Sequence, residues 1–455
     1  MFFTSTFWFI ARLVSLSDVL SFGFFSLVQF TLLLLYYLRT KDENTVNKQT
    51  MTFNLNVIIP LLAIVCIFVS LIVLQEFVYA PFVRGDSWDY VSNSIAITKG
   101  GFNLVSAGKF YLLNSPNFFE TFLSALGRFS GFPPVNSLLI LSLVVAVLLP
   151  VAFYVMSTKY TKNSKVGLLS TLLFVVASVF GWIPFVSEKL ASGTTYSNVG
   201  LVYAIDNLAP KVVYDITQPQ GVLSEGLKTY AFGVLAVIML LYLFDSELKV
   251  KARIPLIALL VGFAFQYHVE EAIIFALAFI PVYLILAILS KGERKTIRYN
   301  LGGVTCGLLV ALLISFISNH AKVVSSVSLD LVSIGAMGVF FALTYLKINT
   351  LGSLLEAFSV KFKLGIFLVV CYLVGLLAFV LVFYGYPGMS SVYSVGVVFQ
   401  GLPFPWYYYP MSLGVVGLLM ILGLLMGFEG DRKITGFLLM VISLMVFGAL
   451  LSWFN

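Results

Sequence analysis

Long apolar runs recur along this 455-residue chain, separated by short polar connections. A hydrocarbon core about 30 Å thick is crossed by about 20 helical residues, so each run of that length predicts a membrane-spanning helix. The runs cover residues 18–38, 54–75, 135–156, 166–186, 229–245, 254–269, 271–289, 299–319, 329–346, 364–384, 411–428 and 436–454. The pattern predicts an all-α polytopic membrane protein that crosses the cell membrane about 12 times and has the lipid bilayer as its surroundings.

Two amphipathic segments lie between the second and third runs. In the first, Trp88, Val91 and Ile95 recur at helical spacing among polar residues, which predicts an interfacial helix over 87–98. The second is predicted to begin near Pro116, because proline suits the first turn of a helix. Its apolar side carries Phe118, Phe119, Phe122, Leu123, Leu126 and Phe129, and its polar side carries Glu120, Thr121, Ser124 and Arg128.

Composition supports the membrane prediction. Hydrophobic residues make up 60% of the chain and charged residues 10%, against roughly 25% charged in a soluble domain. Three cysteines and two histidines are too few and too scattered for a zinc cluster or a disulfide framework, and we expect the thiols to be buried. The net charge of +7 comes from basic residues between apolar runs, a pattern that excludes a nucleic-acid partner.

The basic residues also predict an orientation. Eighteen of the 27 Lys and Arg residues fall in six alternate connections, which the positive-inside rule places in the cytoplasm. These are Arg39/Lys41/Lys48, Lys159/Lys162/Lys165, Lys249/Lys251/Arg253, Lys291/Arg294/Lys295/Arg298, Lys347/Lys361/Lys363 and Arg432/Lys433. The long external loops are then 76–134, 187–228 and 385–410, so we expect the active face to be non-cytoplasmic.

The chain is expected to divide into two parts. Residues 1–53 would form an extra N-terminal transmembrane segment and a cytoplasmic loop, in which residues 1–17 are either an interfacial helix or the first half of a tilted span. Residues 54–455 would form the main transmembrane domain, and we expect no soluble C-terminal domain.

Several residues of the first external loop carry a resemblance. Asp86 is followed by Tyr90 four residues later and by Gly101, and then come Lys109 and a helix led by Pro116. This loop resembles that of the GT-C superfamily of integral-membrane glycosyltransferases, which includes protein mannosyltransferases, aminoarabinose transferases and the catalytic subunit of oligosaccharyltransferase. The resemblance covers residues 54–160 best. Many relatives have a second acid where this chain has Ser87, and many have a C-terminal soluble domain.

The resemblance implies a GT-C-like fold, a polyprenyl-phosphate sugar donor, a protein, lipid or glycan acceptor, and a catalytic aspartate in this loop. Asp86 is the candidate base, because partial removal from water makes a carboxylate a better proton acceptor. Asp89 is the second candidate, as a catalytic group or a metal ligand. The alternative for Asp86 is that it only caps the helix.

Holding the departing phosphate requires cations on the outer face. Arg84 is the nearest to Asp86, and Lys109 is a further candidate, with Tyr90 on the same helix face as Asp86. Each lysine can instead be a residue whose chain reaches along the membrane interface to water.

Three other groups are candidates for the site. The apex between the sixth and seventh runs carries His268, Glu270 and Glu271, which are costly to place among apolar helices and therefore favour a binding role over a plain polar turn. Trp406 and Tyr408 can stack on a sugar or prenyl chain, or belong to an aromatic belt. If the reaction uses Mg²⁺ or Mn²⁺, the candidate ligands are Asp89, Asp206, Asp215 and Glu271.

The sequence therefore predicts a membrane glycosyltransferase with a lipid-linked donor. Two alternatives remain open at this point: a transporter or lipid flippase, and a polymerase or ligase of surface polysaccharide. Carriers hold their charged residues at mid-membrane, whereas here they gather in outer loops. Polymerases place their long catalytic loop late in the chain, whereas here the first loop is the most elaborate.

Overall fold

The computed structural model describes residues 8, 17–41, 54–73, 86–100, 118–176, 229–244, 250–267 and 294–320, with residues 272, 275–276, 278–280, 282–284 and 286. Within these residues the regular structure is α-helical and contains no strand, which confirms the predicted all-α class for this part of the chain. The last four predicted spans, from residue 329 onward, lie outside the described residues.

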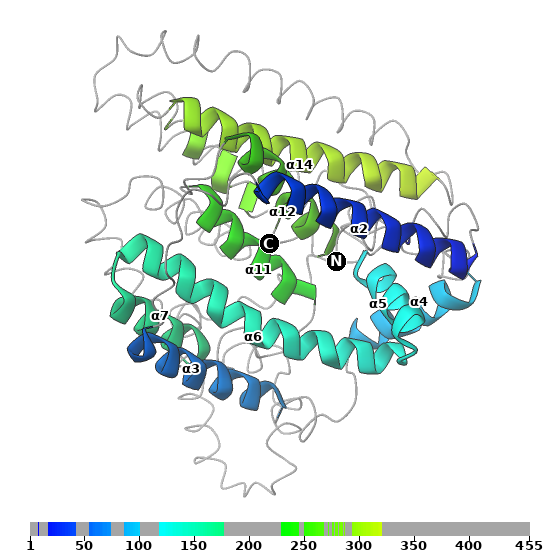
Figure 1. Cartoon of the computed structure of the whole chain (residues 1–455), viewed down its shortest axis with the longest axis horizontal. Helices are drawn as coiled ribbons and strands as arrows, with labels where there is room; N and C mark the ends of the chain where they lie inside the picture. The colour runs from blue at the N-terminus through cyan, green and yellow to red at the C-terminus, as the bar shows by residue number, and fades with distance from the viewer. Residues whose placement is uncertain are drawn as a thin grey trace, which may run out of the picture. The chain divides into compact units, whose positions relative to one another are not determined.

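Each described helix lies on a segment where the apolar pattern predicted one (Figure 1). The helices are α2 (Asp18–Lys41), α3 (Leu55–Val73), α4 (Asp86–Gly100), α5 (Phe118–Ser130), α6 (Pro134–Thr161), α7 (Ser164–Val176), α11 (Thr229–Phe244), α12 (Val250–Tyr267) and α14 (Arg294–His320). Helices α6 and α14 extend past the predicted spans into basic residues, because Lys and Arg are good helix formers whose side chains reach water.

The chain forms two compact units, and helices α6 and α14 each run from one into the other. The first unit comprises Met1–Val147 and Ile314–Val327, and the second comprises Leu148–Leu313 and Ser328–Asn455.

In the first unit α5 and α6 are joined by a short turn. The backbone N–H of Gly131 donates to the carbonyl of Gly127 at 3.0 Å, and Gly131 has a φ of +75°, which suits glycine. Helix α6 then begins at Pro134, whose missing N–H costs nothing in the first turn. The turn brings the α4/α5 pair directly before the long apolar helix.

In the second unit α6 and α7 form a tight hairpin. Lys162 adopts a positive φ of 52° after α6, and the side chain of Asn163 then caps α7, its Oδ1 accepting from the backbone N–H of Lys165 at 3.0 Å. A Cβ at Gly167 would lie 2.1 Å from Oγ1 of Thr158, so a larger residue there would require the Thr158 side chain to move.

Helices α12 and α14 also pack closely, and they run in the same direction. A Cβ at Gly303 would lie 2.9 Å from Ile257, and one at Gly307 would lie 2.6 Å from the carbonyl oxygen of Ala258. Further along, Nε2 of Gln266 donates to the carbonyl of Ala311 at 2.9 Å. Glycines four residues apart are a known way to bring apolar helices into contact.

The C-terminal end of α11 is bonded by side chains from two other helices. Nζ of Lys159 donates to the carbonyl of Tyr242, and the hydroxyl of Tyr160 donates to that of Leu241. From α14, Nδ2 of Asn300 donates to the carbonyl of Phe244 at 3.1 Å. These bonds satisfy carbonyls that a helix leaves without partners, and the lysine complements the negative end of the helix dipole.

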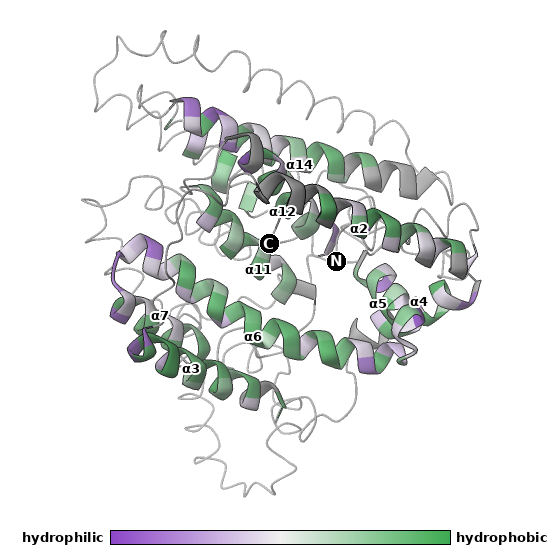
Figure 2. Cartoon of the chain, viewed as in Figure 1, coloured by the Kyte–Doolittle hydropathy of each residue, from purple (hydrophilic) through white to green (hydrophobic). Residues whose placement is uncertain are grey.

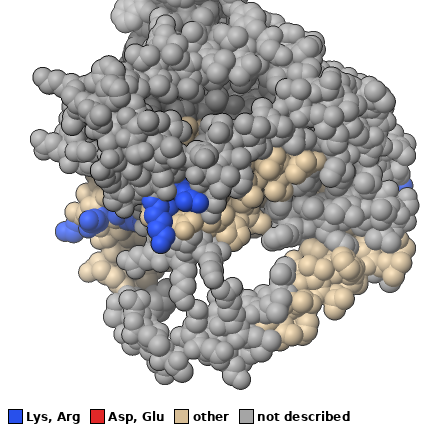
Figure 3. All heavy atoms as spheres, turned by 90° about the horizontal axis from the view of Figure 1, so that it is seen from above, with Lys and Arg blue, Asp and Glu red and all other residues tan. Residues whose placement is uncertain are grey.

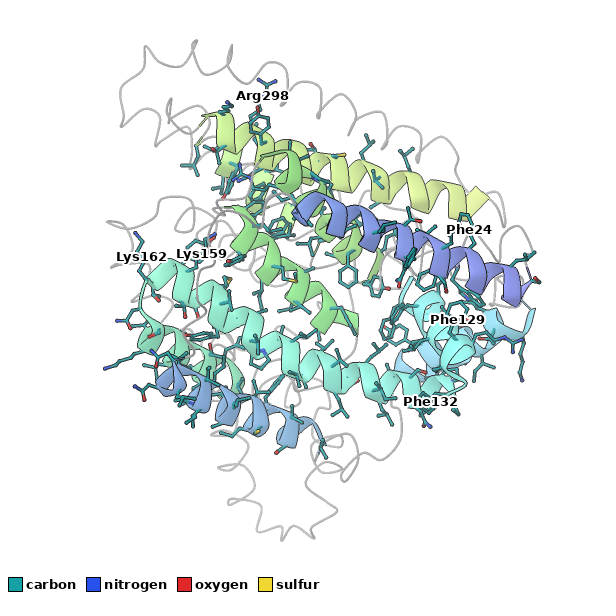
Figure 4. The ribbon with its side chains drawn as sticks, in the orientation of Figure 1. Phe24, Phe129, Phe132, Lys159, Lys162 and Arg298 are labelled. Atoms are coloured by element: carbon teal, nitrogen blue, oxygen red, sulfur yellow. The ribbon has the colours of Figure 1, made fainter. Side chains whose placement is uncertain are left out.

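The same contacts gather the basic helix ends of the second unit. Lys159 lies at the end of α6 and Lys162 directly after it, Arg253 lies at the start of α12, and Lys295 and Arg298 lie at the start of α14. Figure 4 labels Lys159, Lys162 and Arg298. Figure 3 shows described Lys and Arg side chains close together on the visible face. These helix ends belong to three of the six connections that the sequence assigns to the cytoplasm.

Many large apolar side chains of the described helices are exposed. Phe30 on α2 is 65% exposed, Leu55 and Ile59 on α3 are 63% and 62% exposed, and Leu148 on α6 is 47% exposed. Figure 2 shows apolar residues along most of α3 and α6. Among the described residues one helix, α6, is both long enough and apolar enough to cross a membrane. Shorter apolar helices lie at Leu55–Ser70, Ser164–Val175, Ala231–Phe244 and Arg253–Tyr267.

Cys66 departs from the sequence prediction of buried thiols. It is exposed on α3, and Cys306 on α14 is half-buried, with neither in a disulfide. The exposure of Cys66 follows from its place on a helix that also leaves Ile67 exposed.

Candidate functional site

Helix α4 places the two candidate catalytic aspartates. It begins at Asp86, so that Asp86 and Asp89 lie in its first turn, where carboxylates complement the positive end of the helix dipole. Their side chains, and Arg84 and Lys109 as a whole, lie outside the described residues. The starting point of the helix therefore agrees with the sequence, while the chemistry assigned to these residues stays a prediction.

Tyr90 is the candidate site residue whose side chain the structure describes. Its ring is half-buried and meets the ring of Phe119 edge to face, with the ring centroids 5.4 Å apart. Tyr90 thus joins α4 to α5, which is a structural role that the prediction of substrate binding did not include.

Glu120 is a buried carboxylate that sequence reasoning missed. Its side chain is 5% exposed, and its Oε1 accepts a hydrogen bond from Nδ2 of Asn93 at 2.8 Å. The sequence placed Glu120, Thr121 and Ser124 on the polar side of an interfacial helix, yet all three are buried. These three residues are buried because this part of α5 packs against α4.

A chain of hydrogen bonds joins the N-terminal segment to both helices. Nε1 of Trp8 donates to Oγ of Ser124 at 3.1 Å, and the Ser124 and Thr98 hydroxyls are 2.8 Å apart. Because Oγ1 of Thr98 donates its one hydrogen to the carbonyl of Ser94 at 2.8 Å, Ser124 must be the donor to Thr98. The direction of the chain is therefore fixed, and each hydroxyl both donates and accepts.

Aromatic packing supports the same junction. The ring of Phe129 on α5 contacts Trp8 edge to face at 5.1 Å between centroids and stacks on Phe25 of α2 at 5.9 Å. Trp8 itself is fully buried. The sequence predicts that residues 1–17 form either an interfacial helix or the first half of a tilted span. The structure shows that Trp8 of this segment is part of the core around α5.

A sequence signal for this junction existed but was not decisive. Polar residues recur at helical spacing on both helices, as Asn93, Ser94 and Thr98 on α4 and as Glu120, Thr121 and Ser124 on α5. Two such polar stripes in neighbouring amphipathic helices can pair with each other. The sequence alone does not distinguish that arrangement from two stripes facing water.

The other candidate residues lie outside the described part of the chain: His268, Glu270, Glu271, Asp206, Asp215, Trp406 and Tyr408. The structure does describe the helix that leads to the 268–271 apex. Tyr267 ends α12, is buried, and stacks on Phe263 with the centroids 4.3 Å apart. The apex therefore follows a helix end that is fixed by packing.

Metal ligands do not gather in the described part of the chain. No group of three or more His, Cys, Asp or Glu side chains suited to a metal ion occurs among its residues. The ligands suggested by the sequence have side chains outside it, so a divalent cation stays a prediction.

Comparison of the chain with known protein families, with curated proteins and with solved structures finds no match. The functional proposal accordingly depends on the residues and the geometry described above.

Proposed function

We propose that this protein is a polytopic membrane glycosyltransferase of GT-C type, which transfers a sugar from a polyprenyl-phosphate donor to an acceptor on the non-cytoplasmic face. The observation that carries the proposal is the α4/α5 pair. A helix that begins at Asp86 is fixed against a second helix in the segment between α3 and α6. An aspartate at a helix start, in a loop between two apolar helices, would supply the base that such a transfer requires.

Exposed apolar surface supports the membrane location. Soluble monomers rarely expose contiguous apolar patches larger than a few hundred Å². Here α2, α3 and α6 each expose several large apolar side chains, including Phe24, Phe30, Ile59 and Val144. A bilayer would cover these side chains, and the same reasoning extends to the about 12 spans expected from the sequence.

The gathered basic helix ends support the orientation. In the second unit the end of α6 and the starts of α12 and α14 lie at one end, with their Lys and Arg residues. An alternating threading with positive connections inside produces this arrangement. We assign this end to the cytoplasm and the α4/α5 loop to the opposite side.

Asp86 would act as the base in the transfer. It would take the proton of the acceptor hydroxyl as that oxygen bonds to the sugar's anomeric carbon, and the bond from that carbon to the donor phosphate oxygen would break. Charge would develop on the sugar as in glycoside hydrolysis, and Arg84 and Lys109 would hold the departing phosphate. The α4/α5 packing would fix the base while the substrates bind.

A transfer assay tests the proposal. Purified protein in nanodiscs is incubated with radiolabelled polyprenyl-phosphate sugars and a mixture of lipid, glycan and peptide acceptors. We expect labelled product and consumption of the donor. Movement of the intact donor between leaflets without cleavage would favour the flippase, and products growing by repeated units would favour the polymerase.

A further inference from the structure

One face of α4 carries both the proposed base and a contact to a buried acid. Residues 86, 90 and 93 lie three or four apart and therefore share a face of the helix. Tyr90 on this face packs on Phe119, and Asn93 donates to Glu120. Two contacts between α4 and α5 thus lie on the face that begins with Asp86, and the bond between Thr98 and Ser124 joins the same two helices further along.

Glu120 is suited to hold α4 because it is itself fixed. It is 5% exposed, and its neighbours Phe119, Thr121 and Ser124 on α5 are completely buried. Helix α5 is anchored further by Trp8 through Ser124. Asn93, in contrast, is half-buried and lies on α4, whose first turn precedes it. The acid is the anchor, and α4 is the element that it positions.

We propose that Glu120 is a positioning residue for Asp86: its carboxylate, through Asn93, fixes the rotation of α4 and thereby the place of the base. This proposal rests on the proposed function. Asp86 precedes Asn93 by seven residues, about 10 Å along the helix. Because a helix turns as one body, a rotation of α4 at Asn93 turns Asp86 through the same angle and displaces the base. A misplacement of about 1 Å can cost about 100-fold in rate.

Two variants should break the contact and one should keep it. Asn93→Ala removes the donor, and Glu120→Ala removes the acceptor. Glu120→Gln keeps the length and one acceptor oxygen for Asn93. Lys99→Ala, at an exposed position of α4, is the matched control, and the double variant N93A/E120A tests coupling.

The first readout is hydrogen exchange of the α4 backbone amides, which needs no substrate. We expect N93A and E120A to raise exchange over residues 90–99 by at least tenfold, and E120Q and K99A to change it less than threefold. Unchanged exchange in N93A would overturn the proposal whatever the protein's function. N93A decides the question if E120A does not fold.

The second readout is the transfer reaction. We expect N93A and E120A to lower kcat about 100-fold with KM changed little, the double variant to be no slower than either single one, and E120Q to lose less than fivefold. Loss in E120Q equal to that in E120A, with α4 exchange unchanged in E120Q, would mean that the carboxylate acts directly and would overturn positioning. Absence of transfer by the parent protein with every donor would refute the proposed function, and the role toward Asp86 with it.

Discussion

Single hydrogen bonds in the α4/α5 region have consequences that can be measured. The indole N–H of Trp8 is the donor that starts the chain through Ser124 and Thr98. Trp8→Phe keeps an aromatic ring against Phe129 but removes that donor. We expect a loss of about 1–2 kcal/mol in the free energy of unfolding, because Ser124 loses a buried partner. Chemical denaturation in detergent measures this free energy of unfolding. A loss below a few tenths of a kcal/mol would show that this bond does not stabilise the unit.

A second residue-scale prediction concerns Glu271, in the predicted outer apex after α12. If the apex binds the donor through a divalent cation, Glu271→Gln should weaken donor binding by about tenfold or more, because a neutral amide is a weaker ligand for that cation than a carboxylate. Expression and thermal stability in detergent should stay near the parent's. Unchanged donor affinity would assign the apex to a plain polar turn.

At the scale of elements, the α12/α14 contact depends on glycine. A Cβ at Gly307 would lie 2.6 Å from the backbone oxygen of Ala258, which cannot turn aside as a side chain can. We expect Gly307→Ala to destabilise the protein by about 1–3 kcal/mol, as overpacking does. Gly23→Ala on α2 is the control: nothing lies within 4 Å of its Cβ position, and we expect it to be neutral or stabilising by up to about 1 kcal/mol. Equal thermal shifts in the two variants would contradict this packing.

The positions of the helices could be predicted because they depend on local pattern. Apolar runs and helical spacing determined α3, α6 and α11 closely, since a long apolar stretch must satisfy its own backbone hydrogen bonds. The burial of Glu120 could not be predicted in the same way. It depends on how α4 and α5 are rotated toward each other, because Asn93, which bonds Glu120, lies on the other helix.

The candidate site was predictable only in part for the same reason. The start of α4 at Asp86 follows from a local change from apolar to polar residues. Tyr90 is different, because its packing on Phe119 depends on a partner helix. Residues that form a site by approach of distant segments leave no periodic signal in the sequence.

At the scale of the whole molecule, the threading makes a labelling prediction. In a variant without native cysteines, Lys165→Cys and Lys295→Cys lie at the gathered basic ends, and both positions are exposed. In intact cells an impermeant maleimide should label Asn103→Cys in the first external loop and should label the other two only after permeabilisation. Labelling of all three from outside would contradict the orientation.

The most direct test of the whole proposal is the rate of sugar transfer by Asp86→Asn beside the parent protein. Asparagine keeps the size, the hydrogen bonding and much of the helix-capping ability of aspartate, so a purely structural role predicts nearly normal turnover. Loss of a positioned base should slow transfer by about 100-fold or more, with donor binding largely kept because no phosphate-holding cation is removed. Transfer by Asp86→Asn at close to the parent's rate would contradict the assignment of Asp86 as the base.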